Sequence, residues 1–252
     1  MNKIKNLSEG AFLKLFFAFF SAAFLIAALF MPDRSTMFSG FWAILSSPCK
    51  VTTNYFSVGG YAATFLNMGL VALAITLLYT LTKAAVNNVA TLAFLLTVGF
   101  CTWGINLLNM WFPMLGVVVA NLIKKEKLNV NAMLFSTGLA PLLSDLLVRY
   151  PHSEVIGFNV LGFVLAVVVG IIAGMAISSG LGHSPAVHKG FNLYSAALPV
   201  GVTTFFLNGM LYKVLGIELP GAVGDMSVAS WAYTNIFCFV LFGLCIVFLN
   251  SA

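Results

Sequence analysis

The side chains that could do chemistry in this chain are mostly neutral and polar, and they lie inside long apolar stretches. The residues of this kind are Asn67, Asn106, Asn109, Asn159, Asn192, Tyr194, Ser195 and Asn208. An unsatisfied polar group in hydrocarbon is costly, so such residues need hydrogen-bonding partners and often mark the route of a solute. The pattern predicts either a polar path through a membrane or hydrogen bonds between helices.

Two of these asparagines belong to a repeated pattern, Gly-x-Asn-Leu-x5-Pro, which occurs at Gly104–Pro113 and again at Gly190–Pro199. Proline removes a helical N–H and frees a carbonyl one turn earlier, so a helix interrupted there exposes backbone groups. Transporters use broken helices of this kind, in repeated units, to bind solutes near the bilayer midplane. We therefore expect Pro113 and Pro199 to open the backbone beside the asparagines.

Asp145 is the only acidic residue that lies inside an apolar element, and Arg149 follows it by four residues. Two interpretations stay open. The pair can be an i,i+4 ion pair at a helix end, or Asp145 can be a carboxylate that couples transport to a cation or a proton.

Together these arguments predict a solute-binding set and no catalytic, cofactor or metal site. The set is Asn67, Asn106, Asn109, Pro113, Asp145, Asn159, Asn192, Tyr194, Ser195 and Pro199. Hydrolase and nucleotide-binding signatures are missing, and the four cysteines have no metal-ligand spacing. We expect a protein that is not an enzyme and does not bind nucleic acid.

The elements that position these residues follow from composition. Of the 252 residues, 61% are hydrophobic and 8% are charged, with a mean hydropathy of +1.03. Soluble domains carry about 25% charged residues, so a soluble monomer is excluded. The apolar runs are unbroken, whereas the strands of a membrane barrel alternate. The fold class is therefore an all-α, polytopic helical bundle in a lipid bilayer.

We expect seven spans and two short segments that re-enter or lie at the interface. The predicted spans are Ala11–Met31, Phe56–Thr82, Val89–Leu108, Met110–Ile123, Glu154–Ser178, Phe191–Val214 and Ala229–Leu249. The short segments are Phe41–Pro48 and Val130–Val148, the second of which is interrupted by Gly138 and Pro141. Such interrupted pieces are typical of re-entrant helices.

The basic residues support this topology. With the N-terminus in the cytoplasm, the cytoplasmic side holds Lys3, Lys5, Lys14, Lys83, Lys124, Lys125, Lys127, Arg149 and Lys213. The outer side holds only Arg34, Lys50 and Lys189, as the positive-inside rule requires. A crossing at Val130–Val148 would reverse every later segment.

The repeated pattern suggests duplication inside a single membrane domain, residues 1–252. We expect an N-terminal span in 1–40, repeat units at 41–127 and 128–215, and a C-terminal span in 216–252. Asn67 would then correspond to Asn159, and Leu45-Ser46-Ser47 to Leu143-Ser144-Asp145.

Four stretches resemble a family of bacterial polytopic membrane proteins that is known only as a domain of unknown function with repeated halves. They are NYFSVGGYAATFLNMGL (Asn54–Leu70), GINLLNMWFPMLGV (Gly104–Val117), FSTGLAPLLSD (Phe135–Asp145) and HKGFNLYSAALPVG (His188–Gly201). The resemblance implies a multi-pass protein of the bacterial inner (cell) membrane. It implies no substrate.

Two functions stay open. The first is a small-solute transporter or channel with a neutral polar path between the two units, for an uncharged or zwitterionic solute. The second is a structural or accessory membrane subunit, as a monomer or a homo-oligomer, whose polar residues only pack helices.

Overall fold

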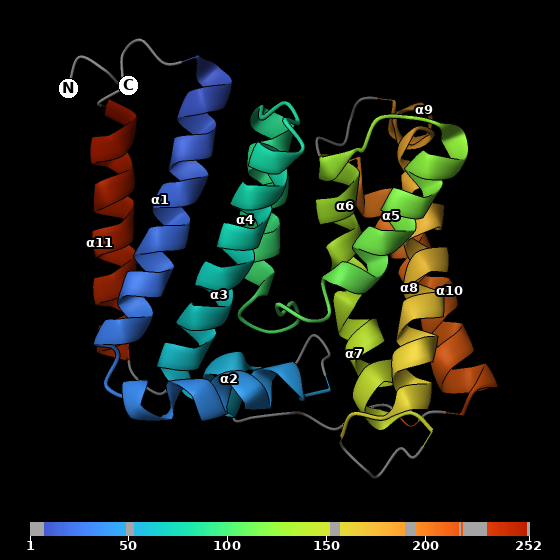
Figure 1. Ribbon diagram of the computed structural model, residues 1–252, viewed down its shortest axis with the longest axis horizontal. Helices are drawn as coiled ribbons and strands as arrows, with labels where there is room; N and C mark the ends of the chain where they lie inside the picture. Colours follow the sequence, from blue (N-terminus) through green and yellow to red (C-terminus); the bar gives the residue numbers. More distant parts are fainter. Residues whose placement is uncertain are drawn as a thin grey trace.

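The computed structural model describes residues 8–48, 53–151, 157–189, 195–216, 218 and 231–250. Within this part of the chain all regular structure is helical. Figure 1 shows mostly upright helices side by side, with one short helix across the lower end. Below, the upper end of the bundle is the end where the first helix begins, as drawn in Figure 1.

Within the described ranges, four segments are long and apolar enough to cross a membrane. They are α1 (Glu9–Phe30), α3 (Tyr55–Leu81), the composite segment Val130–Arg149 and α8 (Val160–Leu181). Spanning a bilayer takes roughly 20 apolar residues, which each of these segments supplies. The prediction of an all-α polytopic membrane bundle is confirmed.

The first half of the bundle is built on α1 and α3, which pack along each other. After α1 the chain forms η1 (Arg34–Thr36) and α2 (Met37–Leu45), and α2 lies across the lower end (Figure 1). The predicted short segment at Phe41–Pro48 overlaps the second half of α2, which ends at Leu45.

A kink in α3 at Gly60 is capped by a side chain from another element. Gly60 has φ 86°, which is left-handed, and the helix resumes after it. The Ala62 N–H, which the kink leaves without a helical acceptor, donates to Asp33 Oδ1 at 3.1 Å. Asp33 therefore acts as the N-cap of the long part of α3.

We expect Gly60→Ala to lower the free energy of unfolding by about 1–3 kcal/mol, because an L-residue is strained at this φ. The new Cβ would also overlap the Asp33 carboxylate. Thermal unfolding in detergent measures the change. Gly99→Ala is the matched control, since no atom lies within 4 Å of its added Cβ. Equal stability of the two variants would contradict this account of the kink.

The helices α4 (Asn88–Phe100) and α5 (Trp111–Lys124) correct the predicted spans Val89–Leu108 and Met110–Ile123. Helices of 13 and 14 residues are about 20 Å long, which is less than the hydrocarbon thickness. Both outer ends lie at the upper end, so α4 enters the bundle and α5 leaves it on the same side (Figure 1). The pair is re-entrant because residues 101–110 form turns instead of helix.

The structure also corrects the prediction that Val130–Val148 re-enters or lies at the interface, because the segment 130–149 crosses the bundle. It consists of α6 (Val130–Ser136), η2 (Thr137–Leu139) and α7 (Ala140–Arg149). A 3-10 turn absorbs the interruption at Gly138, and Pro141 takes the second position of α7, where it costs no hydrogen bond. The direction of the chain is therefore kept.

The second half continues with α8, α9 (Ser184–His188), α10 (Ala197–Gly209), the π-turn η3 (Met210–Val214) and α11 (Trp231–Asn250). Packing contacts show that α5 runs parallel to α8, whereas α10 runs antiparallel to it, with Pro199 beside Gly180. The helices α3 and α8 run in the same direction (Figure 1). The division into two repeat units stays a prediction.

The crossing at 130–149 also changes the distribution of charge. The start of α1, the ends of α3 and α5, and α9 lie at the upper end (Figure 1), and these parts hold or adjoin Lys14, Lys83, Lys124, Lys125, Lys127 and Lys189. The end of α1 and the ends of α7 and α10 lie at the lower end, and these parts hold or adjoin Arg34, Arg149 and Lys213. Arg149 and Lys213 are thus at the other end of the bundle from Lys83, whereas the predicted topology placed all three on one side. Among the described residues the upper end remains the more basic.

Candidate functional site

The turn segment 101–110 between α4 and α5 places non-helical backbone inside the bundle, where its polar groups need partners. Asn67, from the middle of α3, supplies several of them. Its Nδ2 donates to the carbonyls of Cys101 at 3.2 Å and Ile105 at 2.9 Å. Its Oδ1 accepts from the Leu107 N–H at 3.1 Å. Asn67 therefore anchors the turn to α3.

Asn106 and Asn109 close the turn by capping each other. The Asn106 N–H donates to Asn109 Oδ1, and the Asn109 N–H donates to Asn106 Oδ1, both at 2.9 Å. This is the reciprocal geometry of a capping box, which starts the helical path into α5.

The amide groups of the same two asparagines reach three other parts of the fold. Asn106 Nδ2 donates to the Ile44 carbonyl at 3.3 Å and to the Tyr55 hydroxyl at 3.4 Å. Asn109 Nδ2 donates to Ser144 Oγ at 2.7 Å. Asn67, Asn106 and Asn109 are each fully buried, and their hydrogen bonds are made within the protein. In this geometry they build the turn, and solute binding by them stays a prediction.

Asp145 is fully buried on α7, one residue after Ser144. Its Oδ2 accepts from the Tyr212 hydroxyl at 2.8 Å and lies 3.4 Å from Arg149 Nη1. Burying a charge in a membrane protein requires such partners. The i,i+4 pair foreseen in the sequence is present, and the structure adds Tyr212 to it. The π-turn η3, closed by the bond from Leu215 N–H to the Met210 carbonyl, carries Tyr212.

Among the described residues, three polar side-chain contacts join the segment 130–149 to elements that precede it in the chain. Tyr79 Oη donates to Asn131 Oδ1 at 2.6 Å, the hydroxyls of Thr97 and Thr137 are 3.4 Å apart, and Asn109 bonds Ser144. We call these six residues, Tyr79, Asn131, Thr97, Thr137, Asn109 and Ser144, the polar column.

The column follows the segment 130–149 from its beginning toward its end. Positions 131, 137 and 144 are six and seven residues apart, which places successive contacts about 10 Å apart along a helix. Asp145 follows directly at the lower end. Sequence reasoning singled out Asn109 alone, because hydroxyl residues in a helix give no sign of what faces them.

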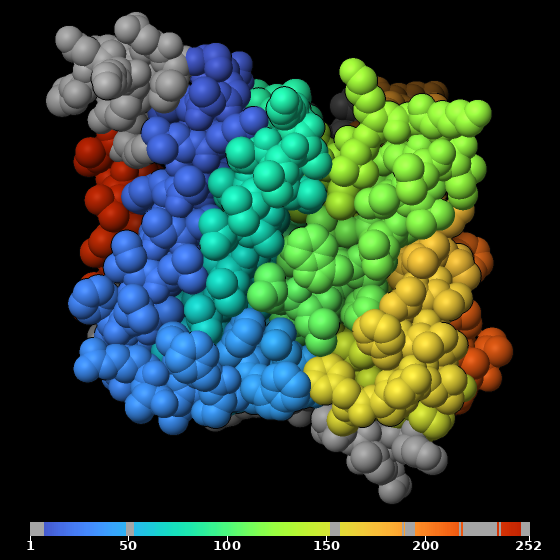
Figure 2. Space-filling view, viewed as in Figure 1, coloured from blue at the N-terminus to red at the C-terminus, as the bar shows by residue number. Residues whose placement is uncertain are grey.

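The upper end of the column opens into a pocket of about 800 Å³, which we call the vestibule. It lies among the end of α3, the start of α4 and the α5–α6 connection, and Tyr79 and Asn131 are part of its lining. Figure 2 shows the surface hollowed at the top between α3 and that connection. Ser195 lines an adjacent pocket that shares Asn131.

The remaining predicted site residues do not join this cluster. Pro113 and Pro199 are each the third residue of a helix, α5 and α10. They open no backbone there, because first-turn N–H groups have no helical acceptor. Asn159 is the N-cap of α8 at the lower end, where its Oδ1 accepts from Gly162 N–H. Asn192 and Tyr194 lie outside the described residues.

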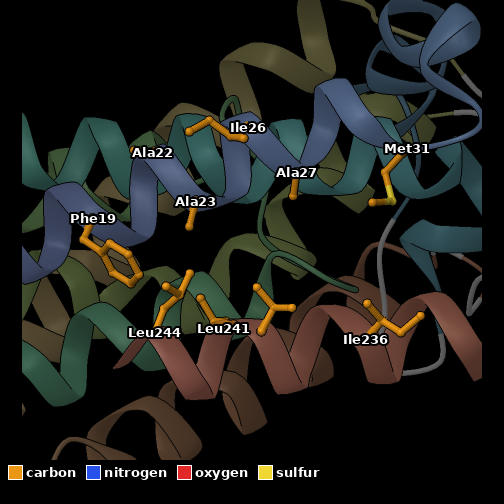
Figure 3. Close-up of a pocket in the computed structure, with 10 residues that line it drawn as sticks. Phe19, Ala22, Ala23, Ile26, Ala27, Met31, Ile236, Leu241 and Leu244 are labelled. Carbon is orange, nitrogen blue, oxygen red and sulfur yellow. The ribbon is translucent and has the colours of Figure 1, made fainter. Parts of the chain in front are cut away.

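A separate pocket of about 400 Å³ lies between α1 and α11. Figure 3 shows side chains from both helices, among them Ala23, Ala27, Ile236 and Leu244, facing one another across it. The described residues that line it are all apolar. It therefore offers no route for a polar solute. Within the described part of the chain, no group of three or more His, Cys, Asp or Glu residues could hold a metal.

Apolar helices with a small set of buried polar side chains between them define an integral membrane protein of the all-α class. The chain belongs to the family described as Protein of unknown function (DUF1576), whose model matches residues 33–213. The resemblance to an uncharacterised family is thus confirmed. No match was found among curated proteins or among solved structures.

Proposed function

We propose that this protein is a membrane transporter or channel for a small solute, with its path along the polar column. The observation that carries the proposal is that three polar side-chain contacts connect the segment 130–149 to earlier elements of the chain at successive depths. Hydrogen bonds of this kind also hold packed helices together. Surfaces that separate to admit water need groups that can be hydrated.

In this proposal the arrangement described above is a closed state. The six residues of the column carry no formal charge, which favours an uncharged or zwitterionic solute. Opening of the lower end would separate Asp145 from Tyr212, so a cation or a proton at Asp145 would favour opening. By the positive-inside rule, we place the upper end in the cytoplasm of a bacterial cell.

A structural or accessory subunit is the second candidate, and a specific observation favours it. The hydrogen bonds of Asn67, Asn106 and Asn109 are all made within the protein, as expected for residues that only hold helices together. The two candidates differ in whether water reaches the column.

Flux through liposomes tests the path. We expect Thr97→Val combined with Thr137→Val to lower the uptake of urea, glycerol or glycine at least tenfold, because valine keeps the packing volume and removes both hydroxyls. Thr91→Val is the control, since its hydroxyl bonds only the Asn87 carbonyl of the same helix among the contacts described. Unchanged flux in the double variant, with Thr91→Val equally active, would place the path elsewhere.

Water access distinguishes the subunit hypothesis without knowledge of the solute. With the four native cysteines replaced, Ser144→Cys should react with a small membrane-impermeant thiol reagent if the column opens. In a subunit without a path, the cysteine at position 144 should not react, because Ser144 is buried in the structure.

A further inference from the structure

The vestibule at the top of the polar column has a lining that is unusually rich in hydrogen-bond donors. Its lining residues include two lysines, Lys83 and Lys127, and three asparagines, Asn87, Asn129 and Asn131. Among the described residues that line it there is no carboxylate. Glu126 is next to Lys127 in the chain but does not belong to the lining.

The three amides are oriented by their oxygens. Asn87 Oδ1 accepts from Ala90 N–H at 3.1 Å, and Asn129 Oδ1 accepts from Ala132 N–H at 3.0 Å. Asn131 Oδ1 accepts from the Tyr79 hydroxyl. These bonds fix the orientation of each amide through its oxygen, and the N–H donors of the three side chains are then the groups available to an anion.

Helix ends do not account for the charge preference of this pocket. The C-terminus of α3 and the N-termini of α4 and α6 all lie at it, and their partial charges cancel in part. The formal charges of its described lining are those of Lys83 and Lys127. Lys83 is held by the left-handed turn that ends α3, at φ 54°.

The connection that carries Lys127 is also fixed in place. The Asn129 N–H donates to Asn121 Oδ1 of α5 at 3.1 Å, and the Tyr79–Asn131 bond joins the start of α6 to α3. The donors of the vestibule thus belong to braced elements, and a ligand would not have to order them.

We propose that the vestibule binds an anionic group, a carboxylate or a phosphate, carried by the solute. Two cations and three amide donors without an acidic neighbour match the acceptor oxygens of such a group. The assignment rests on the transport function proposed above and narrows its substrate class. A zwitterionic solute that carries a carboxylate would match both the uncharged polar column and the basic vestibule.

Binding of succinate and of inorganic phosphate to the full chain in phosphatidylcholine nanodiscs, at constant ionic strength, tests the assignment. We expect Lys83→Gln with Lys127→Gln to raise the half-saturating concentration at least tenfold. The matched control is Lys124→Gln with Lys125→Gln, which removes two charges from the same end of the bundle outside the vestibule lining. It should change the concentration less than twofold.

Equal weakening by the two pairs would overturn the proposal, because it would reflect the general charge of this surface. Absence of saturable binding to the wild-type chain would also overturn it. Size-exclusion profiles confirm folding of each pair, and Lys127→Glu alone is a second variant that should weaken binding if the vestibule is the site.

A second set of nanodiscs, containing phosphatidylglycerol, separates a solute from a lipid headgroup. The proposal expects succinate to bind with similar strength in both sets. If the lipid binds and no free anion does, the vestibule binds a lipid headgroup, and the proposal that it binds a solute is overturned.

The same measurements separate this inference from the transport function. If the chain binds succinate but transports no solute, the anion site in the vestibule stands and the transport function fails. If the chain transports only neutral solutes and binds no anion, the transport function stands and the anion site fails.

Discussion

Asn67→Leu is expected to loosen the turn between α4 and α5 and to lower the free energy of unfolding by about 2–4 kcal/mol. The substitution removes three hydrogen bonds, to the carbonyls of Cys101 and Ile105 and from the Leu107 N–H. All three backbone groups would then lack this partner in the buried interior of the structure. If the turn is part of the path, flux through liposomes should be lost as well.

The buried thiol of Cys101 reports on this change directly. It has no exposed surface in the structure, so we expect slow labelling in the wild-type chain and labelling at least tenfold faster in Asn67→Leu. Mass spectrometry of the Cys101 peptide measures the rate. Asn208→Leu, on the half-buried face of α10, should leave it unchanged. A protected thiol and unchanged stability in Asn67→Leu would show that other contacts hold the turn.

Gly174→Ala is expected to be nearly as disruptive, because it separates α5 from α8. The new Cβ would overlap the Pro113 carbonyl and would lie 2.9 Å from Gly116 Cα and 3.0 Å from Val117 N. Backbone atoms cannot rotate away as a side-chain end does, so the helices must move apart. Overpacking of this kind costs about 1–3 kcal/mol, and we expect the upper part of that range.

Gly201→Ala on α10 is the control for this prediction. No atom lies within 4 Å of a Cβ built at Gly201, and replacing a helical glycine by alanine favours the helix by up to about 1 kcal/mol. Thermal unfolding in detergent should separate the two variants clearly. If Gly174→Ala unfolds at the wild-type temperature, α5 and α8 do not depend on their close approach.

The course of the chain through the bundle illustrates where sequence reasoning stops. Apolar runs located the helices well, because burial in lipid requires length and hydropathy that a sequence displays. They did not reveal that 88–124 returns to its own side while 130–149 crosses. Interruptions occur in both segments. In one, residues 101–110 turn back with the help of Asn67, and in the other a 3-10 turn near Gly138 keeps the direction.

The candidate site shows the same division. Asn67, Asn106, Asn109 and Asp145 stood out in the sequence because polar groups in apolar runs are conspicuous, and the structure places all four in its buried interior. Thr97, Thr137 and Tyr212 did not stand out. Their importance comes from partners 40 or more residues away, which no local pattern encodes.

By itself the sequence determined that this chain is an all-α membrane protein with a few polar side chains inside apolar segments, since both properties are sums over local composition. Only the tertiary structure decided which segments cross, which asparagines hold a turn and which hydroxyls meet. The reason is that a hydrogen bond in the bundle depends on two positions brought together by packing, and each position alone is compatible with many partners.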